Sequence, residues 1–152
     1  MPNASLQEKL AEQHDAVVSA CEELVQRQVQ QKRGLTGAGI KAALKVATAV
    51  RPSFVREVVI RLVPEFAKAL QPQFERCTER ATATGGTVGD AFREELSSRP
   101  GEAADALLGV TDARVAAAAP TVRKAYDRLR GSAKTHVEAA MPDAGATLAR
   151  FV

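Results

Sequence analysis

The sequence predicts an all-α fold, a compact bundle of about seven to nine short helices, several of them broken at prolines. Apolar residues recur at helical spacing, and no alternating strand pattern persists anywhere in the chain. The composition agrees, because Ala is abundant, Trp is absent and there is one tyrosine, a balance that favours close-packed helices over sheets. A chain of 152 residues with 45% apolar and 26% charged residues suits a single helical domain over residues 1–152.

The first helical segment is predicted to begin at a capping box. In Ser5-Leu-Gln-Glu8 the hydroxyl and the carboxylate can each bind a free backbone N–H group at a helix start. An apolar stripe continues from Leu6 to Val29, and the chain is able to break near His14. Gly34 is expected to end this region with a positive φ angle.

The next helix is predicted over residues 37–50, with Thr36 as its N-cap. Gly39, Ala43 and Ala47 lie four residues apart, so another helix can approach closely along this side. We therefore expect a mostly buried central helix.

Prolines punctuate the following segment. Pro52 fits the first turn of a helix, where its missing N–H group has no partner to lose. The apolar period then runs from Val55 to Cys77, past Pro64 and Pro72. Since each proline removes a backbone hydrogen bond and clashes with the preceding turn, we predict breaks at both.

Turn residues organise the second half of the chain. Residues 81–89 contain three glycines and predict a chain reversal, after which Thr87 caps a short helix. Further helices are predicted to begin near Pro100, at Thr111-Asp112 and after Gly131-Ser132, with a last turn or two beyond Met141-Pro142.

The two cysteines, the first residues and the lack of a long apolar stretch predict a reducing cytoplasm. Cys21 and Cys77 fall within helical patterns and lack the spacing of a metal or redox motif, so buried free thiols are expected. The first residues do not read as a signal peptide. No stretch is apolar over the roughly 18 residues that a transmembrane helix needs.

Charge is distributed unevenly along the chain. Residues 1–31 hold five acidic and two basic residues, whereas residues 32–61 hold seven basic residues and one acid. Opposite blocks within one small domain are expected to pair with each other in the fold. The basic block nevertheless offers a possible anion-binding site, made of Lys32, Arg33, Lys41, Lys45, Arg56 and Arg61.

Three specific functions of that block are poorly supported. The glycines of residues 34–41 resemble a phosphate loop, but Ile40 stands where that loop needs its lysine. Lys41, Lys45 and Thr48 form a polar stripe narrower than membrane-surface helices usually have. Nucleic-acid binding is a further alternative, although single-stranded recognition uses exposed aromatic residues, which are scarce in this chain.

No catalytic, cofactor-binding or metal-ligating residue is predicted. His14 and His136 are the only histidines, and no carboxylate cluster accompanies them. His14 lies on an apolar stripe, which is typical of a hydrogen-bonded core histidine. The adjacent pair Glu94-Glu95 points to different sides of a helix and cannot act on one substrate atom.

Three stretches carry a family resemblance: "GLTGAGIKAALKVATAVRPSFVREVV", "ADALLGVTDAR" and "RKAYDRLRGSAKTHVEAAMPDAG". With these stretches the chain resembles an uncharacterised family of small all-helical bacterial proteins, a domain of unknown function. The resemblance implies no activity, cofactor or catalytic residue.

These observations favour a non-enzymatic binding or scaffold protein that acts through helix contacts, in a homo-oligomer or with a protein partner. An alternative is an anion-binding module that engages nucleic acid or acidic lipid through residues 32–61. A third hypothesis is a carrier of an apolar ligand, in which Phe54, Phe66 and Phe74 line a cavity.

Overall fold

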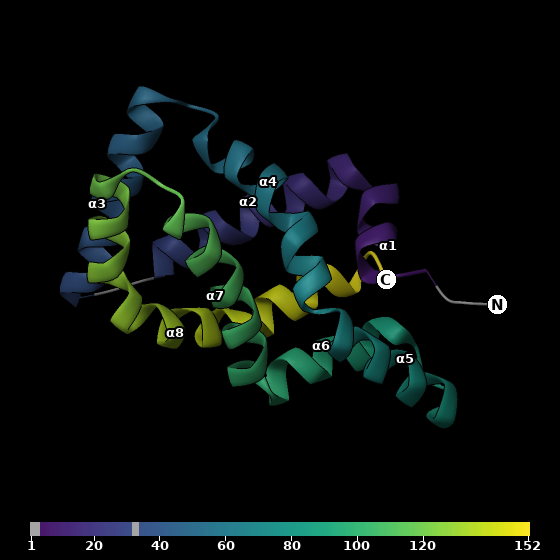
Figure 1. Cartoon of the computed structure of the whole chain (residues 1–152). Helices are drawn as coiled ribbons and strands as arrows, with labels where there is room; N and C mark the ends of the chain where they lie inside the picture. Colours follow the sequence, from purple (N-terminus) through teal and green to yellow (C-terminus); the bar gives the residue numbers. More distant parts are fainter. Residues whose placement is uncertain (1–3, 32–33) are drawn as a thin grey trace.

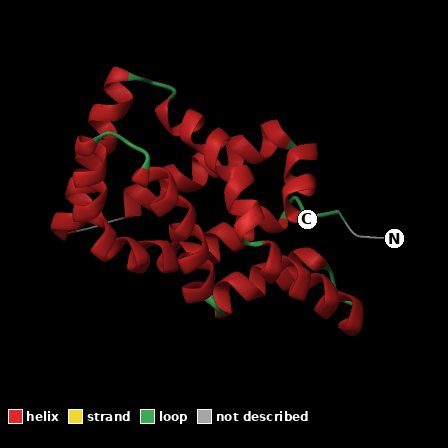
Figure 2. Cartoon of the chain, in the orientation of Figure 1, coloured by secondary structure: helices red, strands yellow, loops and turns green. Residues whose placement is uncertain are grey.

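The computed structural model describes residues 4–31 and 34–152, and over these residues it is built of helices without a strand (Figure 2). This confirms the predicted all-α class. The described helices are α1 (Leu6–Glu12), α2 (His14–Gln31), α3 (Gly34–Val50), α4 (Phe54–Ala69), α5 (Gln71–Thr84), α6 (Val88–Ser98), α7 (Pro100–Ala116) and α8 (Pro120–Ala149).

The long helix α8 organises the packing. Helices α6 and α7 lie against α8, and α2 packs on both α8 and α4 (Figure 1). Helix α1 packs mainly on α4, α5 packs mainly on α6, and α3 lies at the edge of the fold, where it packs chiefly against α2 and α4. Leu6, Val17, Phe92 and Leu96 are among the most deeply buried side chains of the resulting core.

Several predicted helix ends are confirmed by their hydrogen bonds. Ser5 Oγ accepts a hydrogen bond from the Glu8 amide at 3.1 Å, and Thr87 Oγ1 accepts one from the Asp90 amide at 3.2 Å. Helices α1 and α2 separate at Gln13, next to His14. Gly85 ends α5 with a φ angle of 74°, a left-handed conformation that glycine adopts without a steric penalty.

The proline predictions are correct at Pro72 and wrong at Pro64 and at Pro52, which does not lie in the first turn of a helix. The chain breaks between α4 and α5 beside Pro72, which lies in the first turn of α5. Pro64, by contrast, lies inside an uninterrupted α4. The side chain of Pro64 is exposed, and α4 buries Val59 and Ala67 on either side of it, so apolar burial compensates for one lost hydrogen bond. Pro52 precedes α4 in a turn.

Two predicted boundaries in the second half of the chain are also wrong. Thr111 does not begin a helix, because its hydroxyl donates to the Leu108 carbonyl within α7 at 3.0 Å. Gly131 and Ser132 lie within α8, which also continues through Pro142. The alanines, lysines and arginines around Gly131 are strong helix formers, so one glycine does not end the helix.

The expected central helix is peripheral. Helix α3 begins at Gly34, which has the predicted positive φ angle of 76°, and Thr36 therefore lies inside the helix and is not its N-cap. Val46 is 66% exposed and Val50 is 83% exposed, so the prediction of a mostly buried helix is wrong. Small residues permit close approach by a neighbour, but neighbouring helices cover only one side of α3.

Candidate functional site

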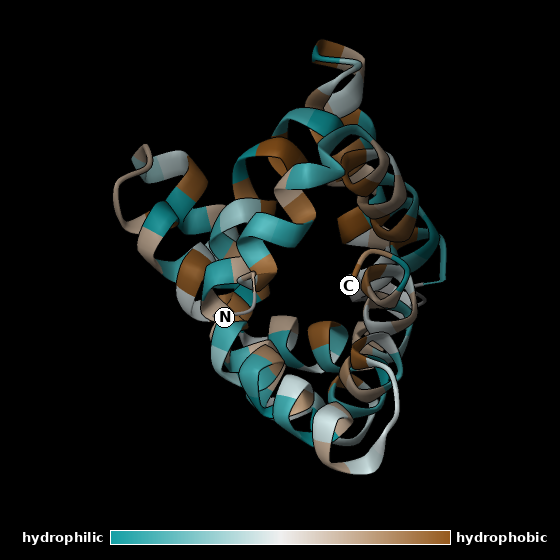
Figure 3. Cartoon of the chain, turned by 90° about the vertical axis from the view of Figure 1, so that its right-hand side faces the viewer, coloured by the Kyte–Doolittle hydropathy of each residue, from teal (hydrophilic) through white to brown (hydrophobic). Residues whose placement is uncertain are grey.

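A cavity of about 340 Å³ lies between the helices and is the candidate functional site. Side chains from α1, α2, α3, α4, α6, α7 and α8 form its wall. Figure 3 shows the helices arranged around a common centre, with hydrophobic stretches in brown along the surrounding ribbons. Side chains from most of the described helices are therefore needed to form the site.

The chemistry of the wall is almost entirely that of hydrocarbon side chains. Among the described residues, polar side chains reach it only from Gln28 and His136, with the Cys21 thiol as a weak further donor. The remaining lining residues are Leu6, Leu10, Leu24, Val25, Val29, Ile40, Val58, Val59, Leu62, Val63, Phe66, Ala67, Leu70, Leu96, Leu107, Val137, Ala140, Met141, Ala144 and Leu148.

Helical periodicity aims these side chains at a common centre. In α4, Val59, Leu62, Val63 and Phe66 recur at intervals of three and four residues and all line the cavity. Residues with this spacing share one helix face. Similar faces of α2 and α8 supply two further sides of the wall.

The three phenylalanines expected to line a cavity have different positions. Phe66 lines the cavity, whereas Phe54 is not part of its wall. Phe74 is 2% exposed and packs edge-to-face on Phe92, with ring centroids 5.8 Å apart. The expectation therefore holds for Phe66 alone.

A polar cluster joins α2 to α8 beside Gln28. The Arg27 guanidinium donates to Asp143 Oδ1 at 2.9 Å and to Asp143 Oδ2 at 3.3 Å, and Gln28 Nε2 donates to Oδ2 at 3.0 Å. The hydrogen bond from Arg27 is the main reason that the pKa of Asp143 is lowered. Gln28 belongs both to this cluster and to the cavity wall, so the cluster holds that part of the wall in place.

The cysteines are buried free thiols, as predicted. Cys21 lines the cavity, and burial raises its pKa to about 11. Cys77 lies elsewhere, with its Sγ donating to the Ala91 carbonyl at 3.5 Å, and burial followed by the nearby Glu95 carboxylate raises its pKa to about 11. Both thiols are protonated at neutral pH, so neither is an activated nucleophile.

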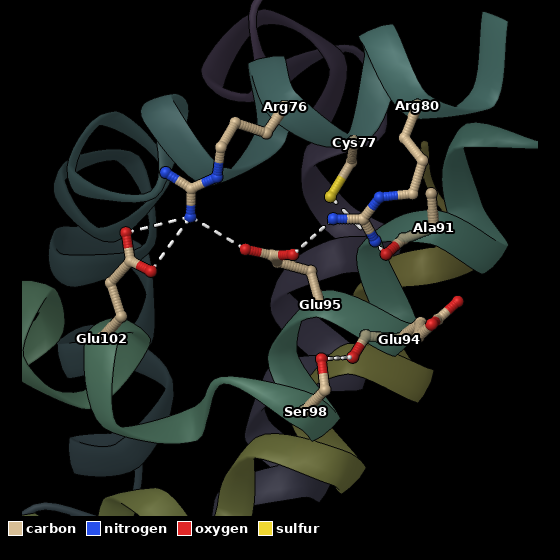
Figure 4. A network of polar contacts seen from close by, with 8 residues as sticks. All are labelled: Arg76, Cys77, Arg80, Ala91, Glu94, Glu95, Ser98 and Glu102. Atoms are coloured by element: carbon tan, nitrogen blue, oxygen red, sulfur yellow. Dashed lines mark hydrogen bonds and ion pairs between the residues drawn. The ribbon is translucent and has the colours of Figure 1, made fainter. Parts of the chain in front are cut away.

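A second polar cluster surrounds the buried carboxylate of Glu95 (Figure 4). Each oxygen of Glu95 accepts a hydrogen bond at 2.8 Å, one from Arg76 and one from Arg80. Arg76 also donates to Glu102, so the cluster ties α5 to α6 and α7. Burial alone raises the pKa of Glu95, but the two guanidinium groups outweigh it and the pKa is lowered. Glu94 is exposed, so the side chains of Glu94 and Glu95 point to different sides of α6, as predicted.

The basic residues predicted to bind an anion are dispersed where the structure describes them. Lys32 and Arg33 lie outside the described residues. Lys41 and Lys45 are exposed, one turn apart on α3. Arg56 points toward α2, where it donates to Glu22 Oε2 and Ser19 Oγ, each at 3.4 Å.

Arg61 is exposed on α4, five residues beyond Arg56, so the two side chains point about 140° apart around that helix. Of the described ion pairs, Arg56 with Glu22 is the one that joins the acidic block to the basic block.

The described histidine and acidic side chains do not gather into a metal-ligating group. The prediction for His14 is wrong, because its side chain is 53% exposed and contacts Asp15 at the start of α2. Within residues 4–31 and 34–152, no group of three or more His, Cys, Asp or Glu side chains is placed to hold a metal ion. None of the described helices is long and apolar enough to cross a membrane.

Fold and site together define a helical protein with an apolar cavity. The chain belongs to a family whose model matches residues 6–152 and whose description is "Family of unknown function (DUF6918)". This confirms the family resemblance of the sequence. No curated protein and no solved structure shows significant similarity to the chain.

Proposed function

We propose that this protein is a non-enzymatic binding protein that holds an apolar ligand, such as a lipid acyl chain, between its helices. The carrying observation is the cavity of about 340 Å³ with its nearly all-hydrocarbon wall. Small-molecule sites in proteins span about 300–1,000 Å³. A wall with two polar side chains favours a ligand that is itself mostly hydrocarbon.

The energetic cost of an empty cavity supports occupancy. An apolar wall left in contact with water forgoes the transfer free energy of burial, about 25 cal/mol per Å². A bound apolar molecule restores much of the lost contact and adds its binding free energy to the stability of the fold.

The remaining features agree with binding as the function. The polar clusters around Asp143 and Glu95 connect helices through arginine–carboxylate pairs, an arrangement suited to holding the bundle together. Free thiols at Cys21 and Cys77 support a reducing compartment, the cytoplasm, as the place of action.

The test is titration with a neutral apolar fluorophore, N-phenyl-1-naphthylamine, followed by displacement with a fatty acid. We expect saturable binding with one site per chain. Ala140 lines the cavity, whereas its neighbour Ala139 is exposed. Ala140→Phe should therefore weaken binding at least about tenfold, and Ala139→Phe should leave it unchanged.

A second substitution guards against failure to fold. Ala140→Leu adds less volume at the same position and should weaken fluorophore binding to a smaller degree, while raising the melting temperature of the unliganded protein by filling part of the void. Absence of saturable binding by the natural chain would contradict the proposal. Equal affinity of the folded Ala140→Phe and Ala139→Phe proteins would contradict it as well.

A further inference from the structure

Helix α3 presents an apolar face to solvent. Val46 and Val50 are 66% and 83% exposed. The alanines at positions 42, 43 and 49 are exposed too. Large aliphatic residues are exposed on α2, α4 and α8 as well, but none of those described is as exposed as Val46 and Val50.

Another side of the same helix faces the interior. Ile40 lines the cavity, and Leu44, one turn further along, packs against the core. At about 100° per residue, Val46 lies about 120° around α3 from Ile40, and Val50 lies about 80° from it. Helix α3 therefore contributes both to the cavity wall and to the exposed face.

Positive charge borders the exposed face. Lys41 and Lys45 are exposed, lie one turn apart along its edge and form no ion pair with a described residue. Residues 34–50 contain no Asp or Glu. The face therefore combines aliphatic side chains with uncompensated ammonium groups.

The polar stripe of α3 is narrower than membrane-surface helices usually have, but the structure exposes Val46 and Val50 beside it, and these side chains can enter lipid. We propose that the exposed face of α3 docks on an anionic lipid bilayer. Valine side chains can enter the boundary between head groups and acyl chains while the lysine ammonium groups contact lipid phosphates. Docking in this orientation places α3, which forms part of the cavity wall, against the bilayer. An apolar ligand would then enter the cavity from the lipid, and this step rests on the proposed function.

Charge complementarity favours a bilayer over a nucleic acid or a second copy of the chain as the partner of this face. A nucleic acid would match the lysines but not the valines. A second copy of the chain would match the valines, but its α3 brings lysines and no carboxylate to this interface.

Vesicle co-sedimentation tests the proposal. We expect the protein to bind phosphatidylcholine vesicles that contain phosphatidylglycerol, and to bind pure phosphatidylcholine weakly. The double substitution Lys41→Gln/Lys45→Gln should weaken binding to the anionic vesicles roughly thirtyfold. Val46→Ser/Val50→Ser should weaken it by at least about tenfold.

Matched controls lie on α8, where Val122 is 51% exposed and Lys124 is exposed. Val122→Ser and Lys124→Gln should leave vesicle binding unchanged. Because all the substituted side chains are exposed, we expect every variant to keep its circular dichroism spectrum.

Other outcomes overturn the proposal. The first is absence of vesicle binding, and the second is equal binding to neutral and anionic vesicles. The third is a concentration-dependent dimer that Val46→Ser/Val50→Ser abolishes, because that result would assign the face to a second copy of the chain. The cavity variant Ala140→Phe keeps α3 intact and should bind vesicles normally. Loss of fluorophore binding and loss of vesicle binding are therefore separable failures.

Discussion

Glu95 shows how one buried charge can join three helices. Its carboxylate is 1% exposed, yet Arg76 and Arg80 each donate a hydrogen bond to it. A buried ionised group is stable only when such partners replace water. In this cluster the two partners come from one helix, so α5 and α6 are fixed in rotation as well as in distance.

Glu95→Gln should lower the free energy of unfolding by about 2 kcal/mol, because the charge-assisted hydrogen bonds to two arginines are weakened. Urea denaturation followed by circular dichroism measures this change. The neighbouring Glu94 is exposed, and Glu94→Gln should stay within about 0.5 kcal/mol of the natural chain. If both variants lost a similar amount of unfolding free energy, the Glu95 cluster would contribute no more to stability than an exposed carboxylate does.

The contacts of a single residue can be predicted from the sequence where its partner is close along the chain. The caps at Ser5 and Thr87 depend on residues three positions away, so their signals are present in the sequence. His14 was misjudged because its surroundings depend on how α1 and α2 separate at Gln13. Likewise, the divergence of Glu94 and Glu95 was predictable, but the arginines that meet Glu95 come from another helix.

At the scale of elements, helices α6 and α8 approach closely at glycines. A Cβ atom on Gly89 would lie 2.8 Å from the Ala149 carbonyl oxygen, and one on Gly145 would lie 3.2 Å from the Arg93 backbone. These two glycines therefore permit a separation that alanines would not. Gly131, also within α8, has no such neighbour within 4 Å.

Gly89→Ala should destabilise the protein by about 1–3 kcal/mol, because the backbone of α8 must move away from the added methyl group. Gly131→Ala should have the opposite effect and stabilise it by roughly 0.5–1 kcal/mol through helix propensity. Thermal unfolding of the two variants measures the difference. A stabilising Gly89→Ala would refute the close approach of α6 and α8.

Helix boundaries illustrate which elements sequence patterns can define. Pro72 coincides with a boundary, whereas Pro64 and Pro142 lie inside α4 and α8. All three have the same local chemistry, so tertiary packing decides whether a helix continues through a proline. Helix α3 shows the same limit, because its composition permits burial but the rest of the bundle covers only one side.

At the scale of the whole molecule, several arginine–carboxylate pairs connect distant helices. Asp143 is held by Arg27 across α2 and α8, and Glu65 is held by Arg114 across α4 and α7. The pKa values of Glu95, Asp143 and Glu65 are all lowered in the folded protein. Folding stability is therefore linked to their ionisation.

We expect the urea midpoint to be nearly constant from about pH 8 to pH 6 and to fall below about pH 4.5. Carboxylates with lowered folded pKa values stabilise the fold above their unfolded pKa of about 4, and this contribution disappears as the pH drops through the folded values. Glu95→Gln should have a shallower acid slope than the natural chain. Parallel slopes in the two proteins would contradict this linkage.

The cavity is the feature that sequence patterns identify least well. The spacing of Val59, Leu62 and Phe66 predicts an inward helix face, but a face that lines a void and a face that fills a core have the same period. The difference depends on how far apart α2, α4 and α8 stand, and that distance is set by contacts distributed over the whole bundle. The sequence therefore leaves an apolar carrier as one hypothesis among three.

Tyr126 gives the molecule a useful optical property. It is the sole tyrosine, and the chain has no tryptophan. Its hydroxyl contacts Thr111 Oγ1 at 2.8 Å and donates to Asp112, at the contact between α7 and α8, and it is not part of the cavity wall. Intrinsic tyrosine emission therefore monitors that helix junction alone, and an extrinsic dye in the cavity can be excited at wavelengths longer than those that tyrosine absorbs, with no competing signal from the polypeptide.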